Sequence, residues 1–189
     1  MGLRFTVVPL PDVDEVALLG TFHGARVEMA RAIAHGKCLV AAQLHPQALV
    51  LTADTVVVVD KPDALGKPES IDQAKVFLRM LQGRTHTVAT GLALHDGRTG
   101  RSVAATEITK VTFAPMTEAE IAWYAGTGEP LDKAGAYAVQ GLGSLFITGI
   151  EGDYLNVVGL PVHRLRLLIA ELGYDLRQWM AQPKPQRGP

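Results

Sequence analysis

Residues 48–59 read Ala-Leu-Val-Leu-Thr-Ala-Asp-Thr-Val-Val-Val-Val and decide the fold class. The stretch is apolar and rich in β-branched residues, which is typical of a strand at the centre of a sheet covered on both faces. Asp54 interrupts it, and a carboxylate in such a run costs free energy to bury unless it is paired, hydrogen-bonded or metal-bound. The stretch predicts a buried strand with a functional carboxylate. The alternative is a structural Asp that caps a turn or pairs with a Lys.

Helices and strands alternate around this stretch. The sequence predicts a short strand at 5–8 and a helix from Thr21 to about Gly36, where glycine would end it. Ser70 is placed to cap a helix over 71–81 that Gly83 ends. Segments 87–94 and 102–113 alternate in polarity around Asp96-Gly97, which predicts a β-hairpin.

The second half of the chain begins with a capping box, Thr117 and Glu120, that predicts a short helix to about residue 125. The glycine-rich segment 126–143 is expected to be a long functional loop with a short strand at 136–140. A strand at 145–150 follows. Pro161 is expected near the start of a last helix, with Val162, Leu165, Leu168 and Leu172 on one apolar stripe and Gly173 at its end. This order favours an α/β or α+β sheet layered with helices.

Composition restricts the class of protein. The chain has 189 residues, 48% of them hydrophobic, and a formal net charge of −1, so it gives no reason to expect a nucleic-acid partner. No run reaches the roughly 18 apolar residues of a membrane span. Cys38 is the single cysteine, which we interpret as a small buried hydrophobe in a cytoplasmic protein. We predict one domain over residues 1–180 and a disordered, proline-rich tail at 181–189.

Several polar residues are candidates for phosphate chemistry. Asp54 could hold Mg²⁺ or take a proton from water. Lys67, in Leu-Gly-Lys-Pro at 65–68, could bind phosphate, although a solvated loop lysine is the alternative, and the same holds for Lys37. The loop 128–141 carries Lys133 and Gln140, and a glutamine amide offers both a donor and an acceptor to a pyrimidine edge. Its alternative is a structural loop whose charges pair with each other.

The order of the motifs resembles one family. They are ADTVV (53–57), LGKP (65–68), LQGRTH (81–86), TGEP (127–130), DKAGAY (132–137), QG (140–141), GDY (152–154) and NVVGLP (156–161). Together they resemble the Maf family of nucleoside triphosphate pyrophosphatases, over about residues 5–172. The resemblance implies an α/β fold of the inosine-triphosphatase-like type, with a mixed twisted sheet flanked by helices and two lobes around a cleft. It leaves open whether the chain forms a homodimer.

The resemblance also implies an activity and a site. The reaction is metal-dependent cleavage of a nucleoside triphosphate to the monophosphate and pyrophosphate, with Mg²⁺ or Mn²⁺ as the cation. Asp54 is implied as general base and metal ligand, Glu15 as a second metal ligand, and Lys37 and Lys67 as phosphate contacts. A further set is implied in substrate binding: Thr55, Gln140 and Lys133. Thr55 and Gln140 resemble the branch that prefers dTTP and UTP.

Members of the family carry one further feature before the segment that residues 2–8 of this chain resemble. It is a strand followed by Ser-x-Ser-Pro-Arg-Arg, whose hydroxyl, backbone amides and guanidinium groups would bind the triphosphate. Its absence here implies either a start codon placed too late or a truncation that impairs catalysis and leaves a sheet edge bare. The alternatives to an enzyme are therefore a nucleotide-binding protein without turnover and a regulatory protein that acts on a division or replication partner.

Overall fold

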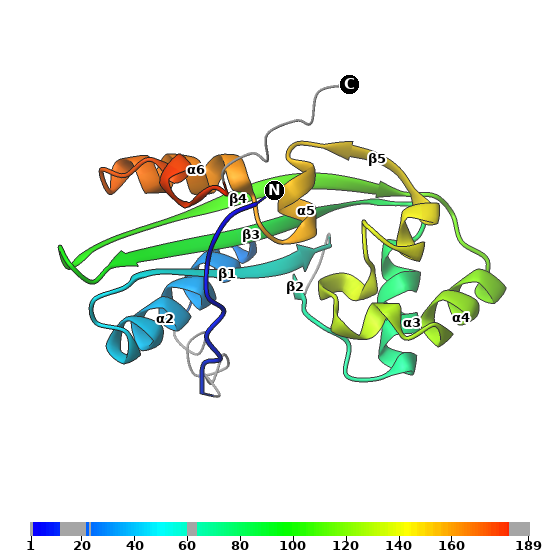
Figure 1. Cartoon of the computed structure of the whole chain (residues 1–189). Helices are drawn as coiled ribbons and strands as arrows, with labels where there is room; N and C mark the ends of the chain where they lie inside the picture. Colours follow the sequence, from blue (N-terminus) through cyan, green and yellow to red (C-terminus); the bar gives the residue numbers. More distant parts are fainter. Residues whose placement is uncertain (1, 12–21, 23, 60–63, 182–189) are drawn as a thin grey trace, which may run out of the picture.

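The computed structural model describes residues 2–11, 22, 24–59 and 64–181. Its centre is one five-stranded sheet in the order β2-β1-β3-β4-β5. The strands are β1 (Leu49–Val58), β2 (Ala64–Leu65), β3 (Thr85–Asp96), β4 (Arg101–Phe113) and β5 (Ile147–Glu151). Figure 1 shows β1, β3 and β4 as long, twisted ribbons with helices on both sides. The α/β class is confirmed, although the described strand pairs are all antiparallel where the resemblance implies a mixed sheet.

Strand β1 is the apolar stretch that decides the fold class. It pairs with β3 over its whole length, but on its other side β2 pairs only with Val57 and Val58. Leu51 and Ala53 are exposed, so the expected cover on both faces is wrong for the first half of the strand. The reason is that a β-branched composition indicates a strand, while the burial of each face depends on elements that are distant in the sequence.

The two faces of the sheet bury different helices, because successive side chains of a strand point to opposite sides. Val56 of β1 and Ala89 of β3 pack with Ala30 of α2 (Met29–Leu44). Their neighbours Val57 and Val88 face the opposite way. That second face is covered by the remaining helices: α3 (Ile71–Leu81), α4 (Glu118–Gly126), α5 (Tyr154–Val158) and α6 (Val162–Glu171).

Helix α2 begins and ends later than the sequence predicts. A short turn, η1 (Arg26–Glu28), precedes it, and Gly36 lies buried inside it instead of ending it. The expected end at Gly36 is wrong, because the glycine is buried within the helix and the alanine-rich run continues to Leu44. Pro46 then prevents further helix. Cys38 is buried in this helix, as expected, and burial raises the pKa of its thiol.

The caps of α3 and α4 are confirmed. The Ser70 hydroxyl accepts a hydrogen bond from the Gln73 backbone N–H, and Gly83 has a positive φ of 65° just past the helix end. Thr117 and Glu120 form the reciprocal capping box of α4. The 3.6-residue apolar period of α6 is confirmed as well, with Leu165 and Leu168 buried.

The connection after α4 differs from the expectation. Segment 136–140 contains no strand; the chain instead makes three short 3₁₀ turns, η2 (Glu129–Asp132), η3 (Ala134–Ala136) and η4 (Leu142–Phe146). Gly135 and Ala136 both have positive φ, 71° and 60°, which is incompatible with an extended strand. Strand β5 then begins two residues later than predicted, at Ile147.

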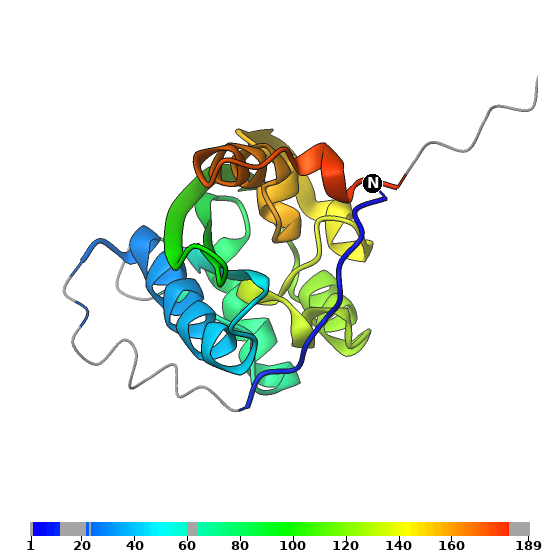
Figure 2. The ribbon, with the colours of Figure 1, turned by 60° about the vertical axis from the view of Figure 1, so that its left-hand side comes forward.

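The N-terminal segment is not the predicted strand. Residues 5–8 belong to no sheet, and Phe5 and Val7 are exposed. Figure 2 shows the segment running along the outside of the molecule, with its first described residues near the red C-terminal turn. Leu3 makes an isolated bridge with Met180, and the Arg4 N–H donates to the Trp179 carbonyl in the turn η5 (Leu176–Trp179). Of the predicted tail, 182–189 lie outside the described residues. Within the described parts, no helix has the length and apolarity needed to cross a bilayer.

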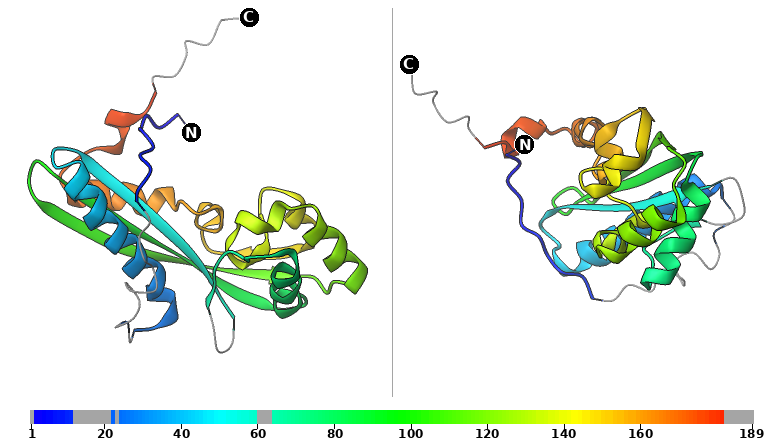
Figure 3. Two further views of the ribbon diagram at one scale, coloured as in Figure 1. Left: turned by 90° about the horizontal axis from the view of Figure 1, so that it is seen from below. Right: turned by 90° about the vertical axis from the view of Figure 1, so that its right-hand side faces the viewer.

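Two apolar clusters lie side by side on the face opposite α2. Val88 and Val111 belong to the cluster with α3 and α4, and Leu92 belongs to the cluster with α6. The buried hydroxyls of Thr90 on β3 and Thr109 on β4 lie between the two clusters. The left view of Figure 3 shows α2 and α6 at one end of the long strands and α4 at the other. The structure thus has two lobes that share one sheet. The buried polar residues between their cores, which include Thr90 and Thr109, are called the seam here.

Candidate functional site

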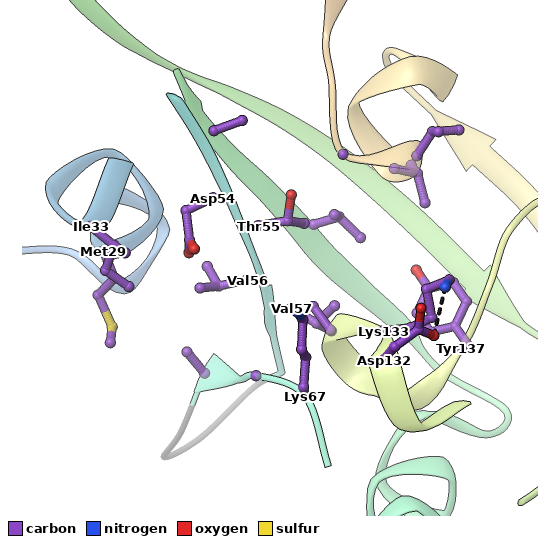
Figure 4. Close-up of a pocket in the computed structure, with 18 of the residues that line it drawn as sticks. Met29, Ile33, Asp54, Thr55, Val56, Val57, Lys67, Asp132, Lys133 and Tyr137 are labelled. Carbon is purple, nitrogen blue, oxygen red and sulfur yellow. Dashed lines mark hydrogen bonds and ion pairs between the residues drawn. The ribbon is translucent and has the colours of Figure 1, made fainter. Parts of the chain in front are cut away.

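A cleft of about 710 Å³ lies beside β1. Figure 4 shows it between α2 and the turns that follow α4. Its walls come from α2, β1, the loop after β2, η2, η3, Tyr137 and the end of α5. Five of the residues that the sequence singles out line this cleft: Lys37, Asp54, Thr55, Lys67 and Lys133.

Asp54 and Lys37 form an ion pair on the α2 side of the cleft. The Lys37 Nζ lies 2.8 Å from Asp54 Oδ1, and the side chains are 21% and 16% exposed. Asp54 is in the middle of β1 and Lys37 is in the middle of α2. The pair is therefore held by two rigid elements, and its partial exposure leaves it accessible from the cleft. Both sequence interpretations of Asp54, a paired carboxylate and one available to a ligand, are compatible with this geometry.

Gly91 of β3 sets the distance between α2 and the sheet at this point. It stands opposite Asp54 in the β1–β3 register. A Cβ at Gly91 would lie only 2.2 Å from the Arg31 backbone nitrogen and 2.3 Å from the Ala30 carbonyl carbon. Because glycine has no Cβ, the helix backbone can approach the sheet closely here. This close approach brings Lys37 within reach of the carboxylate.

Thr55 points to the other side of β1, as Figure 4 shows. Its hydroxyl is 2.9 Å from the hydroxyl of Thr90, its cross-strand neighbour on β3. The Thr90 hydroxyl in turn donates to the Asn156 backbone carbonyl of α5, at 3.0 Å. The cleft therefore reaches both faces of β1, with Asp54 on the α2 side and Thr55 on the α5 side.

Lys67 and Lys133 come from two loops that are tied together. The Gly135 N–H donates to the Gly66 carbonyl at 3.0 Å, which joins the loop after β2 to η3. Gly135 also packs so closely on β1 that a Cβ would lie 2.7 Å from a methyl group of Val57. Lys133 pairs with Asp132 at 2.6 Å, and Lys67 is exposed. The two ammonium groups thus line the cleft from neighbouring loops.

Gln140 is exposed and is not among the residues that line the cleft. Its loop is ordered by Glu129, whose carboxylate accepts hydrogen bonds from the Tyr124 hydroxyl and from the N–H groups of Leu142 and Gly143. Burial opposes the charge of Glu129, but these backbone hydrogen bonds outweigh it, so the net pKa is lowered. The role of Gln140 remains a prediction.

The metal prediction rests on Asp54 and Glu15, and Glu15 lies outside the described residues. Among the residues that are described, no three His, Cys, Asp or Glu side chains converge in a way that could hold an ion. The Asp54 carboxylate nevertheless suits Mg²⁺ or Mn²⁺, because such cations are commonly bound by one or two carboxylates together with the phosphates of a substrate. The residues present therefore fit a cation that arrives with a polyphosphate.

Some site residues are not evident from sequence reasoning. Asn156, the only asparagine of the chain, is fully buried and donates to the Val88 carbonyl and to the Thr109 hydroxyl. Thr90 gives no signal in the sequence, because alternating threonines are ordinary in a strand. Glu151 and Asp153, two carboxylates near the end of β5, do not line the cleft: Asp153 caps α5, and Glu151 lies 3.8 Å from Lys110.

The back of the cleft ends in a buried aromatic group. Tyr137 lines the cleft, and its hydroxyl lies 2.9 Å from His86 Nε2. Phe113 packs edge-on against both rings. Burial lowers the pKa of His86 to about 4 and raises that of Tyr137, so both side chains are neutral near pH 7. This group supplies shape and no charge.

The fold and cleft define an α/β protein suited to polyphosphate ligands, in which the carboxylates of Asp54 and Asp132 and three ammonium groups surround a shared space. Residues 1–172 match the family described as Maf-like protein. The chain belongs to the Maf family.

Curated relatives bear a common name. A protein of Symbiobacterium thermophilum is 43% identical over 93% of this chain and 87% of its own length. One from Moorella thermoacetica is 46% identical over 93% of this chain and 88% of its own, and one from Myxococcus xanthus is 43% identical over 96% and 88%. All three are named dTTP/UTP pyrophosphatase.

Proposed function

We propose that this protein is a nucleoside triphosphate pyrophosphatase that acts on dTTP and UTP. The observation that carries the proposal is the Asp54–Lys37 pair, which faces a cleft shared with Lys67 and Lys133. The names of the relatives, at 43–46% identity over nearly the whole chain, support the same reaction. The place of action is inferred to be the cytoplasm, a reducing compartment in which the Cys38 thiol would persist.

In this proposal, Asp54 is the general base. Its carboxylate accepts a proton from a water molecule while the water oxygen attacks the α-phosphorus, and the bond from that phosphorus to the bridging oxygen breaks. The products are the nucleoside monophosphate and pyrophosphate. A carboxylate can serve this role because it is partly exposed and held in place by Lys37.

The lysines bind the negatively charged part of the substrate. Lys37, Lys67 and Lys133 would contact phosphate oxygens and offset the charge that develops on the leaving pyrophosphate. The tie between Gly135 and Gly66 would keep the Lys67 and Lys133 loops at a fixed separation. Asp54 would also hold the Mg²⁺ or Mn²⁺ ion, with Glu15 as a candidate second ligand. A bound cation supplies charge neutralisation on the phosphates.

The base of the nucleotide is expected on the α5 side of β1. Thr55 offers a hydroxyl there, next to the apolar side chains of Val88 and Val157. Gln140 would contact the base only if its loop moves toward the cleft, since the residue lies outside the lining. This placement separates the charged and the apolar ends of a nucleotide along one cleft.

The experiment is pyrophosphate release from dTTP by the Asp54→Asn variant in the presence of Mg²⁺. Asparagine has the same shape but cannot take the proton, so kcat should fall by about 10²–10⁴-fold. Asp72→Asn is the matched control, because Asp72 is an exposed carboxylate on α3 and should not affect the rate. Undiminished release by Asp54→Asn would refute the assigned role. Nucleotide binding without any turnover by the unmodified protein would favour a binding function instead.

A further inference from the structure

On the α5 side of the cleft, the Thr55 hydroxyl lies among apolar side chains. Around Thr55 the wall is formed by Val88, Val157 and Val158. Gly159 keeps space next to the hydroxyl, since a Cβ there would lie 3.6 Å from Thr55 Oγ1 and the φ of +109° disfavours a side chain. The polarity of that single hydroxyl therefore decides which ligand atom can meet it.

The hydrogen bonds of Thr90 determine this polarity. A threonine hydroxyl has one proton to donate. The Asn156 carbonyl can only accept, so the Thr90 proton is used in that bond. The contact between Thr55 and Thr90 at 2.9 Å then requires Thr55 to donate. With its proton directed at Thr90, the Thr55 hydroxyl faces the cleft with lone pairs only.

The opposite orientation would cost a buried hydrogen bond. If Thr90 donated to Thr55, its bond to the Asn156 carbonyl would be lost at a site where Thr90 and Asn156 are both fully buried. The Asn156 side chain is fixed as well. Both of its amide protons are used, in hydrogen bonds to the Val88 carbonyl and the Thr109 hydroxyl, so the acceptor carbonyl cannot turn away easily.

We propose that Thr90 is a positioning residue that makes the Thr55 hydroxyl an obligatory hydrogen-bond acceptor and thereby selects the N3–H group of thymine and uracil. This inference rests on the proposed function. Thymine and uracil linked to a sugar have one hydrogen-bond donor, N3–H, so that group is the one that can meet Thr55. Cytosine in the same position presents a bare N3 lone pair to the hydroxyl, and two acceptors repel each other.

The test is the ratio of kcat/KM for dTTP to that for dCTP in Thr90→Val and Thr90→Ser. Valine has nearly the same shape but cannot accept the Thr55 proton, so Thr55 can turn and donate to cytosine N3. We expect the preference for dTTP to fall by roughly ten- to hundredfold in Thr90→Val. Thr90→Ser keeps the hydroxyl and should keep the preference. A merely structural role would lower both rates together and leave the ratio unchanged, which would overturn the proposal.

A measurement on the unmodified protein keeps the test independent of folding defects in the variant. N3-methylated dTMP lacks the donor, so it should compete with dTMP much more weakly, as should dCMP, in equilibrium binding. The binding measurement also distinguishes the proposed enzyme function from the proposed selection of the base. Absence of hydrolysis with a clear preference for dTMP would refute the enzyme function and support the selection by Thr55. Equal binding of the three monophosphates would overturn the selection whether or not the protein hydrolyses triphosphates.

Discussion

His86 is a buried base that stays neutral in the folded protein. It is 3% exposed, and its Nε2 contacts the Tyr137 hydroxyl. Burial lowers its pKa from 6.5 to about 4. Between these two values the unfolded chain binds a proton on this residue and the folded chain does not. The stability that the neutral state contributes is therefore present above pH 6.5 and lost as the pH falls toward 4.

We predict that acid destabilises the protein by up to about 3 kcal/mol through His86 over this pH range. Urea unfolding at several pH values measures the effect. His86→Gln retains a hydrogen-bonding side chain without the titration, so its unfolding free energy should depend less on pH between 6.5 and 4. His163→Gln is the control, because His163 is exposed. Parallel pH curves for His86→Gln and the unmodified protein would contradict the prediction.

At the scale of residues, the sequence identifies charge better than it identifies hydroxyl groups. Asp54 is evident because a carboxylate in an apolar run needs a partner, and the structure provides Lys37 at 2.8 Å. Thr90 and Asn156 cannot be selected in the same way. Their importance comes from bonds across 66 residues of sequence, between β3 and α5, and no local pattern records such a contact. The catalytic and binding roles themselves stay predictions that the proposed experiments address.

Among the elements, α5 shows how a very short helix can be held in place. It has five residues, too few to be stable by itself. Asp153 caps its first turn, Gly159 ends it with a φ of +109°, and Asn156 joins it to β3 and β4. Hydrogen bonds to the sheet, more than helix propensity, therefore fix the wall of the cleft that α5 forms.

Asn156→Ala is predicted to lower the free energy of unfolding by about 2–4 kcal/mol. The substitution leaves the Val88 carbonyl and the Thr109 hydroxyl without this donor and creates a cavity in the seam. Chemical denaturation measures the loss. Tyr154→Ala is the control, because Tyr154 lies on the same helix but is 42% exposed and should cost much less. Equal losses for the two variants would show that the helix is held mainly by other contacts.

Element boundaries are predictable where a local group defines them. Ser70, Thr117 and Gly83 define the ends of α3 and α4, because each acts on backbone groups within a few residues. The end of α2 and the expected strand at 136–140 fail for the opposite reason. Gly36 is buried inside α2, and the backbone at Gly135 packs closely against Val57 on β1. Distant packing overrides local preference at both places.

On the scale of the whole molecule, three strands pass through both lobes. β1, β3 and β4 contribute residues to the cluster with α3 and α4 and to the clusters with α2 and α6. Each lobe also contains one tryptophan: Trp123 lies on α4, and Trp179 packs against the α6 cluster. A strand cannot lose its partners in one lobe without weakening the pairing in the other.

The protein is therefore predicted to unfold in one cooperative transition. Single-tryptophan variants, Trp123→Phe and Trp179→Phe, report on one lobe each. In each variant, the fluorescence midpoint in urea should coincide with the midpoint by far-ultraviolet circular dichroism, as two-state unfolding requires. Because both probes are compared within the same variant, each variant is its own control. A fluorescence change that precedes the circular dichroism change in one variant would indicate lobes that melt separately.

Helix α2 packs closely on Gly91, so a substitution at this glycine could change the geometry of the site. One added methyl group at this position would act as a wedge beneath the helix and push the backbone at Ala30 and Arg31 outward. Lys37 lies less than two turns further along the same helix. The shift would therefore move its ammonium group away from the Asp54 carboxylate. A substitution at Gly91, which does not line the cleft, could thus weaken the ion pair between Lys37 and Asp54.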